Sequence, residues 1–339
     1  MNIKKYKTAI LTMTLGVILT AIVGCGDDVH PGKFVAMSSN SAIYSEDGIN
    51  WSEPEEIKSG SSWRSVCYAN DMFVAMGNNG YTAYSTDGKS WNAKVKLTTD
   101  TWYVCYGNGK FVAVGGQEVA YSTDGKNWTQ LPTGSSKLTN SHAMVASICY
   151  GNGKFVAVTD NATDTNQIIY SIDGITWYRG EFSTPVNSNL KSVCYGKGRF
   201  VAVGDEDSPK IAYSTDGKNW TIPSTTLTIN PVSVCYGDGK FIAIDENSNT
   251  AFSADGKQWH TGTSLPTHLS SGNGGSIHYQ SICYGDGKFI VIGYAYPAPP
   301  SCSAILYSTD GNKWNEIEIS DVQLKSVTYG LDSDLFGFL

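Results

Sequence analysis

Short alternating runs of apolar and polar residues, each ended by a glycine-containing turn, recur along the chain beyond residue 29. The run Ser192–Tyr195 leads into Gly196-Lys197-Gly198, and the apolar run Phe200–Val203 follows. The same arrangement returns over Ser233–Ile244. Alternation with a period of two residues predicts half-buried β-strands, and no comparable helical period follows residue 25. We therefore expect an all-β chain of short antiparallel strands.

A second pattern, aromatic-Ser-x-Asp-Gly-x-x-Trp, closes each repeat. Its seven copies begin at Tyr44, Tyr84, Tyr121, Tyr170, Tyr213, Phe252 and Tyr307. Glycine permits positive φ in a turn, and aspartate accepts hydrogen bonds from the backbone N–H groups of its own turn. One unit is thus predicted to be strand, Gly-x-Gly turn, strand, variable loop, strand, Asp-Gly turn and short strand.

Four antiparallel strands in a unit of roughly 40 to 50 residues are typical of a β-propeller blade. First strands are expected near Val66, Val104, Ile148, Val193, Val234, Ile282 and Val327. The first aromatic-to-Trp copy has no such strand before it, and the last such strand has no copy after it. We therefore predict a seven-bladed β-propeller over residues 32–339, whose first blade is closed by the C-terminal strand so that no sheet edge is free. The tail Leu335–Leu339 resembles a further second strand, which leaves an eight-bladed ring or a truncated chain open.

The N-terminal segment predicts export. Lys4, Lys5 and Lys7 precede the uncharged, mostly apolar stretch Ala9–Val23, which is shorter than the roughly 20 residues of a spanning helix. Residues 22–25, Ile-Val-Gly-Cys, resemble a bacterial lipobox, which implies cleavage before Cys25 and lipidation of this residue. We predict a lipoprotein signal peptide over residues 1–24, a lipidated N-terminus and linker over residues 25–31, and a protein anchored outside the cytoplasm in the bacterial cell envelope. The leaflet stays open, and an ordinary anchor or secretory signal is the alternative.

The recurring Asp-Gly pattern resembles the Asp-box, or bacterial neuraminidase repeat, although the usual motif has one residue between Asp and Gly. Asp-boxes occur in sialidases, sortilin-type receptors and photosystem II assembly factors. The resemblance implies a propeller in which the boxes are structural turns remote from any active site. It implies this role for Asp47, Asp87, Asp124, Asp173, Asp216, Asp255 and Asp310. It also implies that the following tryptophans pack under the turns: Trp51, Trp91, Trp128, Trp177, Trp220, Trp259 and Trp314.

Catalysis of the sialidase type can be tested on the arginines. Sialidases hold the substrate carboxylate with three arginines, whose planar guanidinium groups suit carboxylates. This chain has three in all, Arg64, Arg179 and Arg199, at different positions of the repeat. We therefore predict no catalytic residues and a noncatalytic scaffold that binds a protein or ligand. A sialidase-like glycoside hydrolase or carbohydrate-binding protein is the alternative, and a purely structural envelope protein is a third hypothesis.

The net charge excludes one class of partner, and the positions of the cysteines predict their chemical state. The net charge is −7, with no basic stripe, so nucleic acid is not an expected partner. No cofactor is predicted, and we expect a monomer. Six cysteines share one position of the first strands: Cys67, Cys105, Cys149, Cys194, Cys235 and Cys283. Stacked sheets lie ~10 Å apart whereas a disulfide needs Cα atoms within ~7 Å, so these are predicted to be free thiols between blades. They lack the CxxC spacing of metal sites. Cys302, in a proline-rich stretch, is expected to be more exposed.

Loop length differs mainly on one predicted face of the ring. The tight turns share one face, and the second-to-third-strand loops share the other with the connections between blades. Function commonly lies on loops that a rigid frame displays. We therefore predict a partner surface on the variable face, around the channel mouth. The candidate residues are Tyr294, Tyr296, His142, Asp160, Asp164, Asp205 and Asp207. Loops that vary because nothing constrains them are the alternative.

Overall fold

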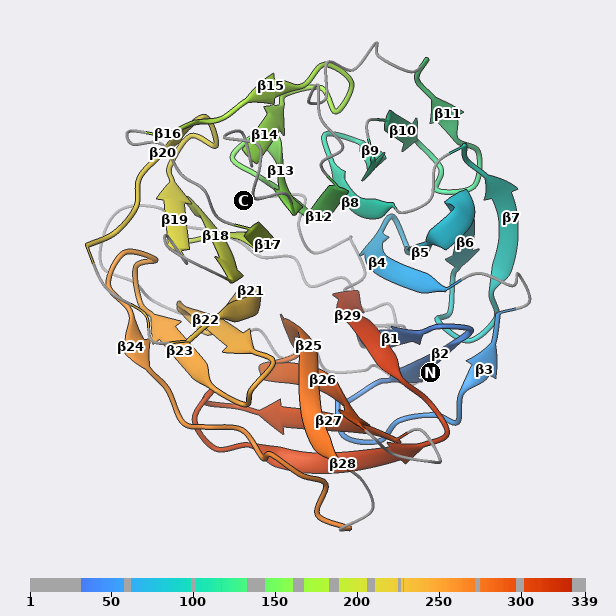
Figure 1. The fold of residues 1–339 in the computed structure, drawn as a ribbon. Helices are drawn as coiled ribbons and strands as arrows, with labels where there is room; N and C mark the ends of the chain where they lie inside the picture. The colour runs from blue at the N-terminus through green and yellow to red at the C-terminus, as the bar shows by residue number, and fades with distance from the viewer. Residues whose placement is uncertain are drawn as a thin grey trace, which may run out of the picture. The chain divides into compact units, whose positions relative to one another are not determined.

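The computed structural model describes residues 32–57, 62–98, 102–116, 118–132, 144–160, 168–182, 189–205, 211–224, 227, 229–271, 275–296 and 302–330. These residues all belong to the unit Pro31–Leu339, in which seven of the β-sheets, which we call blades, are arranged in a ring (Figure 1). The predicted signal peptide, Cys25 and the tail Leu335–Leu339 lie outside the described residues.

The first three blades are as follows, with the strands of each in order from the inner strand outward. Blade 1 contains β29 (Leu324–Gly330), β1 (Lys33–Ser38), β2 (Ser41–Ser45) and β3 (Glu55–Glu56). Blade 2 contains β4 (Trp63–Ala69), β5 (Met72–Gly77), β6 (Tyr81–Ser85) and β7 (Asn92–Lys96). A single 3-10 turn, η1 (Asn78–Gly80), joins β5 to β6. Blade 3 contains β8 (Tyr103–Gly107), β9 (Lys110–Gly115), β10 (Glu118–Ser122) and β11 (Thr129–Gln130).

The remaining blades continue in chain order. Blade 4 contains β12 (Met144–Gly151), β13 (Lys154–Asp160), β14 (Ile168–Ser171) and β15 (Tyr178–Arg179). Blade 5 contains β17 (Asn189–Gly196), β18 (Arg199–Asp205) and β19 (Ile211–Ser214). Blade 6 contains β21 (Pro231–Gly237), β22 (Lys240–Asp245), β23 (Thr250–Ser253) and β24 (His260–Thr261). Blade 7 contains β25 (Ser276–Gly285), β26 (Lys288–Tyr296), β27 (Cys302–Ser308) and β28 (Asn315–Ser320).

The two ends of the described chain meet in blade 1. Strand β29 pairs antiparallel with β1, with Val35 opposite Thr328 and Ala36 opposite Val327. This pairing confirms the predicted closure by the C-terminal strand. The described residues make seven blades, so the eight-bladed alternative is not the observed fold.

Blade 5 departs from the predicted four-stranded pattern. Its sheet has three strands, and the next segment joins it only by a bridge between Tyr213 and Thr221. Strand β20 (Asn219–Trp220) pairs instead in parallel with β16 (Glu181–Phe182), which follows blade 4. The buried Trp220 ring lies 6.4 Å from the rings of both Phe182 and Phe200, measured between centroids. Aromatic packing thus draws this outer segment toward the neighbouring blade.

The core lies between blades and is built from one aromatic pair per blade. The second residue of each second strand is a phenylalanine that is at most 2% exposed: Phe34, Phe73, Phe111, Phe155, Phe200, Phe241 and Phe289. Each packs against the tyrosine near the end of its own inner strand, with ring centroids 4.5–4.9 Å apart. Burying one phenylalanine contributes about 1.5–3 kcal/mol, so this ring of pairs is a principal source of stability.

Candidate functional site

The inner strands β4, β8, β12, β17, β21, β25 and β29 line the central channel (Figure 1). We call the end of the ring where these strands begin the loop face, and the end where they turn into the second strands the turn face. Six of them carry a register shift at one shared position near the loop face. Strand β8 has no such shift. A β-bulge of this kind leaves one extra residue unpaired and can redirect its side chain.

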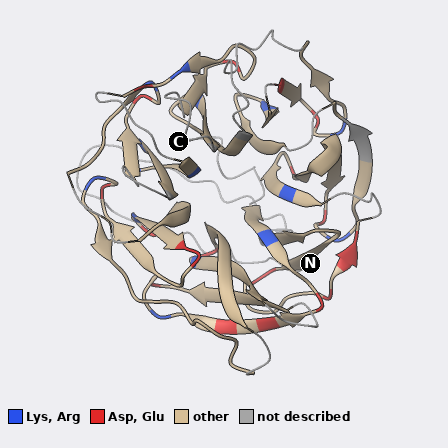
Figure 2. Ribbon diagram, in the orientation of Figure 1, with Lys and Arg blue, Asp and Glu red and all other residues tan. Residues whose placement is uncertain are grey.

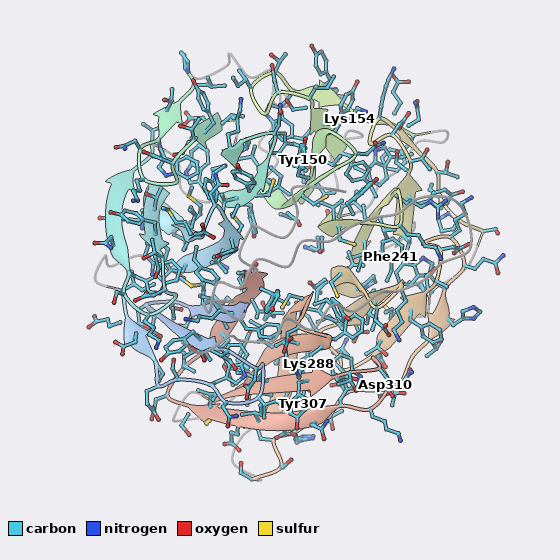
Figure 3. All side chains as sticks on the ribbon, turned by 180° about the vertical axis from the view of Figure 1, so that it is seen from behind. Tyr150, Lys154, Phe241, Lys288, Tyr307 and Asp310 are labelled. Atoms are coloured by element: carbon cyan, nitrogen blue, oxygen red, sulfur yellow. The ribbon has the colours of Figure 1, made fainter. Side chains whose placement is uncertain are left out.

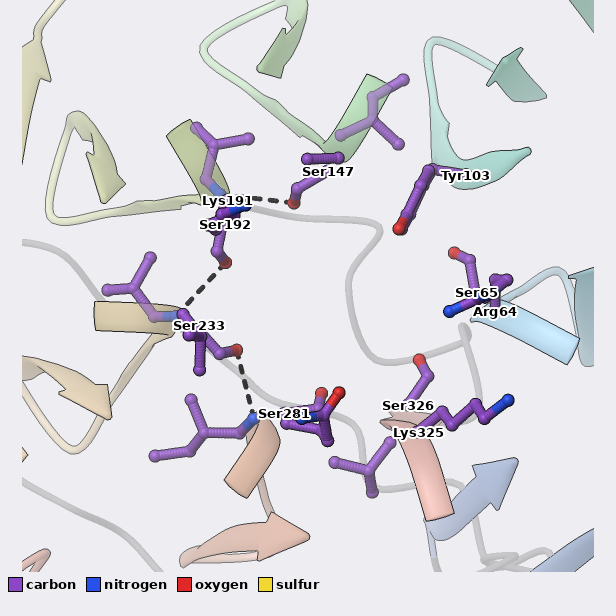
Figure 4. A pocket seen from close by; sticks show the side chains of 18 of the residues that line it. Arg64, Ser65, Tyr103, Ser147, Lys191, Ser192, Ser233, Ser281, Lys325 and Ser326 are labelled. Atoms are coloured by element: carbon purple, nitrogen blue, oxygen red, sulfur yellow. Dashed lines mark hydrogen bonds between the residues drawn. The ribbon is translucent and has the colours of Figure 1, made fainter. Parts of the chain in front are cut away.

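The bulged residues form the first layer of a pocket at the mouth of the channel (Figure 4). These residues are Arg64, Ala146, Lys191, Val232, Gln280 and Lys325. The second layer contains Tyr103 and six serines: Ser65, Ser147, Ser192, Ser233, Ser281 and Ser326. The third layer is aliphatic: Val66, Val104, Ile148, Val193, Val234, Ile282 and Val327. The cavity measures about 430 Å³ and changes from charged to apolar with depth.

The serine layer ties neighbouring blades together. The backbone N–H of Val193 donates to Ser147 Oγ at 3.3 Å, and that of Val234 donates to Ser192 Oγ at 3.2 Å (Figure 4). Ser65 and Ser233 accept the same bond from the next blade at 3.2 Å. A hydroxyl that accepts one bond keeps its own O–H to donate. The wall of the pocket therefore offers donors to a ligand while it holds the ring together.

Three cations stand in the first layer, and Figure 2 shows them on β4, β17 and β29 around the centre of the ring. Arg64 and Lys325 belong to adjacent blades, whereas Lys191 lies across the pocket (Figure 4). Burial lowers the pKa of Lys325, and the positive charge of Arg64 lowers it further. The carboxylate of Glu246, in the loop after β22, also lines the cavity. The described residues at the mouth thus carry three cationic side chains and one carboxylate, and Arg64 and Lys325 repel each other across blades 1 and 2.

The seven predicted Asp-Gly turns lie on the turn face, away from this pocket. In each, the serine hydroxyl donates to the Asp Oδ1 atom at 2.9–3.2 Å. The same Oδ1 accepts the backbone N–H groups two and three residues later at 2.7–2.9 Å. The glycine after each aspartate has φ between 67° and 73°, which only glycine adopts freely. One oxygen of each carboxylate is therefore engaged by three hydrogen bonds within its own turn.

These bonds lower the pKa of all seven turn aspartates. Burial opposes ionisation of Asp216, but hydrogen bonds from the backbone N–H and side-chain amide of Asn219 outweigh it and hold the pKa at about 2. At Asp310 the backbone N–H of Lys313 is the main cause of a pKa of about 2. The turn carboxylates therefore stay ionised in the folded protein far below neutral pH.

The tryptophan at the end of each motif packs beneath the turn or donates a hydrogen bond to it. Five of them donate Nε1–H to the carbonyl oxygen of the turn glycine at 3.1–3.3 Å: Trp51, Trp91, Trp128, Trp220 and Trp259. Trp177 is 1% exposed in the core between blades 3 and 4, and Trp314 packs against the core between blades 6 and 7. Figure 3 shows the ring from behind and labels three residues near the turns, Tyr150, Lys154 and Asp310.

The structure describes some of the predicted partner surface. Tyr294 and Tyr296 lie at the loop-face end of β26, where the Tyr296 side chain is 63% exposed and Tyr294 stacks on His278 at 5.8 Å between ring centroids. Strand β25 has ten residues against five to eight in the other inner strands, so this hairpin extends past the mouth. Asp160 and Asp205 end β13 and β18 on the same face, but their side chains are not among those described. His142, Asp164 and Asp207 lie outside the described residues.

The three arginines occupy separate places. Arg64 alone of them lines the pocket. Arg179 is exposed on the outer strand β15, and Arg199 on β18 donates to the carbonyl oxygen of Asp255 in the next blade. Among the described residues, no group of three His, Cys, Asp or Glu side chains is placed to hold a metal ion.

The cysteines of the inner strands are free thiols, and burial raises the pKa of each. The expectation for Cys302 was wrong, because this residue lies in β27 and is 4% exposed. Its strand extends further toward the loop face than the proline-rich stretch indicated.

Within the part of the chain that the structure describes, no helix has the length and hydrophobicity of a membrane span.

Sequence reasoning missed the cationic layer, although a signal was present. Arg64, Lys191 and Lys325 each precede the Ser-Val pair of an inner strand. Aligned by repeat, they share one position and must point to one channel once the ring closes. The arginines alone do not reveal this cluster, because two of its three members are lysines. It is found only when arginines and lysines are aligned together by repeat.

Comparison with known proteins supports the fold. The structure is similar to that of YCF48 bound to a D1 peptide, with a TM-score of 0.56, 16% sequence identity, and coverage of 78% of this chain and 86% of that chain. It is also similar to YCF48 from Cyanidioschyzon merolae, with a TM-score of 0.51, 14% identity, and coverage of 77% and 86%. No protein-family model and no curated protein matches this chain. At such identities the likeness shows the propeller architecture alone.

Proposed function

We propose that this protein is a noncatalytic, lipid-anchored propeller of the bacterial cell envelope that binds a partner protein on its loop face. The observation that carries the proposal is the pocket at the channel mouth, where three cations and a layer of serines surround a cavity of about 430 Å³ on a closed frame. A concave cavity of this size, with charged groups and hydrogen-bond donors above an apolar base, is suited to binding a ligand. The similar YCF48 structure is of a propeller-like chain bound to a D1 peptide, which favours a protein partner here.

The arrangement of charged side chains favours binding over catalysis. A sialidase-type site requires three converging arginines, whereas Arg64 is the one arginine among the pocket residues. The turn aspartates are engaged in their own turns and face away from the pocket. The exposed ring of Tyr296 beside the mouth adds an aromatic contact of the kind enriched at protein interfaces.

Site-specific photocrosslinking tests the proposal. A photoreactive residue at Tyr296 should give one discrete adduct in intact envelopes, whereas the same residue at Lys313 on the turn face should give none. The adduct should disappear in the double variant R64E K325E and persist in K313E. An adduct that still forms in R64E K325E would overturn the assignment of a protein partner to the loop face. An adduct that contains a glycan in place of a protein would overturn it as well.

The anchor is tested separately. Residues 22–25, with Cys25 at the cleavage point, support lipidation. Metabolic labelling with a palmitate analogue should mark the wild-type chain and leave C25S unlabelled. Labelling of C25S, or wild-type protein found wholly in the soluble fraction, would contradict the envelope assignment.

A further inference from the structure

We infer that the channel pocket receives a single carboxylate joined to a short apolar group. This inference rests on the proposed binding function and specifies the chemistry that the pocket selects. Its basis is the layering of the cavity, in which charge, hydrogen-bond donors and apolar surface follow one another in depth.

Arg64 and Lys325 lie at the rim, and their hydrogen-bond partners within the described part of the chain are uncharged. Arg64 Nε donates to Asn78 Oδ1 at 3.2 Å, and Lys325 Nζ donates to Ser62 Oγ at 2.9 Å. Lys325 is partly buried, and Arg64 lowers its pKa. An anion between the two would relieve their repulsion, and the planar guanidinium of Arg64 suits a carboxylate in particular.

Glu246 limits where such an anion can sit. It belongs to blade 6 and lines the same cavity, so it repels negative charge from that side. The favourable position is therefore beside blades 1 and 2, near Arg64 and Lys325. Glu246 repels a multiply charged group such as phosphate more strongly than it repels a single carboxylate.

The wall and floor specify the rest of the ligand. Ser65 lies next to Arg64 and accepts a backbone N–H from the next blade, which leaves its O–H group to donate to a carboxylate oxygen. Ser147, Ser192 and Ser233 line the far side of the pocket (Figure 4). Below them the floor is made only of valine and isoleucine. A branched aliphatic group attached to the carboxylate would be desolvated there. The end of a polypeptide chain and a small free acid both present this chemistry.

Titration of the full-length protein in detergent micelles tests the inference. The probes are 4-methylpentanoate, its amide 4-methylpentanamide, and the peptide acetyl-Gly-Gly-Gly-Leu with a free or an amidated C-terminus. We expect at least one free acid to bind and its amide to bind about tenfold more weakly or worse, because a charge-assisted hydrogen bond is worth at least the ~1.4 kcal/mol that equals a factor of ten. R64Q and K325Q should each weaken the acid similarly, whereas the exposed-site controls R179Q and K313Q should bind as wild type.

Each outcome decides the inference. Binding of the peptide acid alone identifies a chain end as the source, and binding of both acids shows that a small acid suffices. Equal affinity for acid and amide, no binding of either acid, or unchanged affinity in R64Q and K325Q overturns the inference. Competition by inorganic phosphate at the same concentration would also overturn it. If the inference is overturned but the Tyr296 crosslink still forms, the proposed function stands. If carboxylate binding is retained but the crosslink is lost, only the partner protein is removed from the proposal.

Discussion

Tyr68 of blade 2 lies so close to Gly330 of blade 1 that a Cβ atom on this glycine would overlap the Tyr68 ring. The same relationship joins five other neighbouring blades, from Gly107 with Tyr150 to Gly285 with Tyr329. Blade 2 has Ala69 at the glycine position, and there the following pair, Tyr106 and Phe111, has the widest spacing of the seven, 4.9 Å. Glycine at the end of six of the seven inner strands thus lets the next tyrosine cover it, and at Gly330 this contact completes the ring.

Gly330→Ala should destabilise the propeller by about 1–3 kcal/mol, because the added methyl group overpacks a well-filled interface. The change should appear as a lower midpoint of urea unfolding. Adding Tyr68→Ala should relieve the clash, so the double variant should lose less stability than the sum of the two single changes. Strictly additive losses would show that Tyr68 and Gly330 do not constrain each other.

Acid should destabilise the protein in a range set by the turn aspartates. Their folded-state pKa lies below the unfolded value, to about 2 for Asp47, Asp216 and Asp310, so the folded state binds fewer protons. The stabilisation is complete above about pH 4 and is lost as the pH falls toward about 2. Thermal melting between pH 5 and pH 2 should show this fall, and a variant with these three aspartates changed to asparagine should show a shallower one. An equally steep fall in the variant would place the titrating groups elsewhere.

The inner-strand thiols should react slowly in the folded protein. Burial raises the pKa of Cys67, Cys194 and Cys283, so almost no thiolate is present at pH 8. In a C25S variant, a thiol-reactive dye should label the native protein slowly and label it fast once urea unfolds the ring. Several thiols reacting within seconds under native conditions would contradict their placement between blades.

Lys240 links two blades on the turn face, where its Nζ donates to the carbonyl oxygen of Asp310 at 2.7 Å. Lys240→Met keeps the aliphatic stem but loses this bond, which should cost about 0.5–1.5 kcal/mol in unfolding free energy. The exposed Lys313 is a matched control, and Lys313→Met should change the free energy little. Equal effects of the two substitutions would show that the interblade bond adds no stability.

Much of the fold was predictable because it depends on local chemistry. Alternation around Val193 and Val234 predicted strands, Gly196 and Gly237 ended them, and the unmatched strand at Val327 predicted closure of the first blade. Blade 5 was not predictable in this way. Whether Trp220 extends its own blade or pairs beside Phe182 depends on how a neighbouring blade packs, which a repeat pattern does not contain.

The amino-acid sequence alone determined the number of blades, the order of strands and the seven Asp-Gly turns, since the strand period and turn preferences act over a few residues. Tertiary structure decided where the chemistry lies. A bulge forms only where the register between two paired strands shifts by one residue. At these bulges Arg64, Lys191 and Lys325 line one channel, although they lie far apart in the sequence. Their convergence is a consequence of ring closure, because residues at one repeat position become neighbours only when every blade faces the same axis.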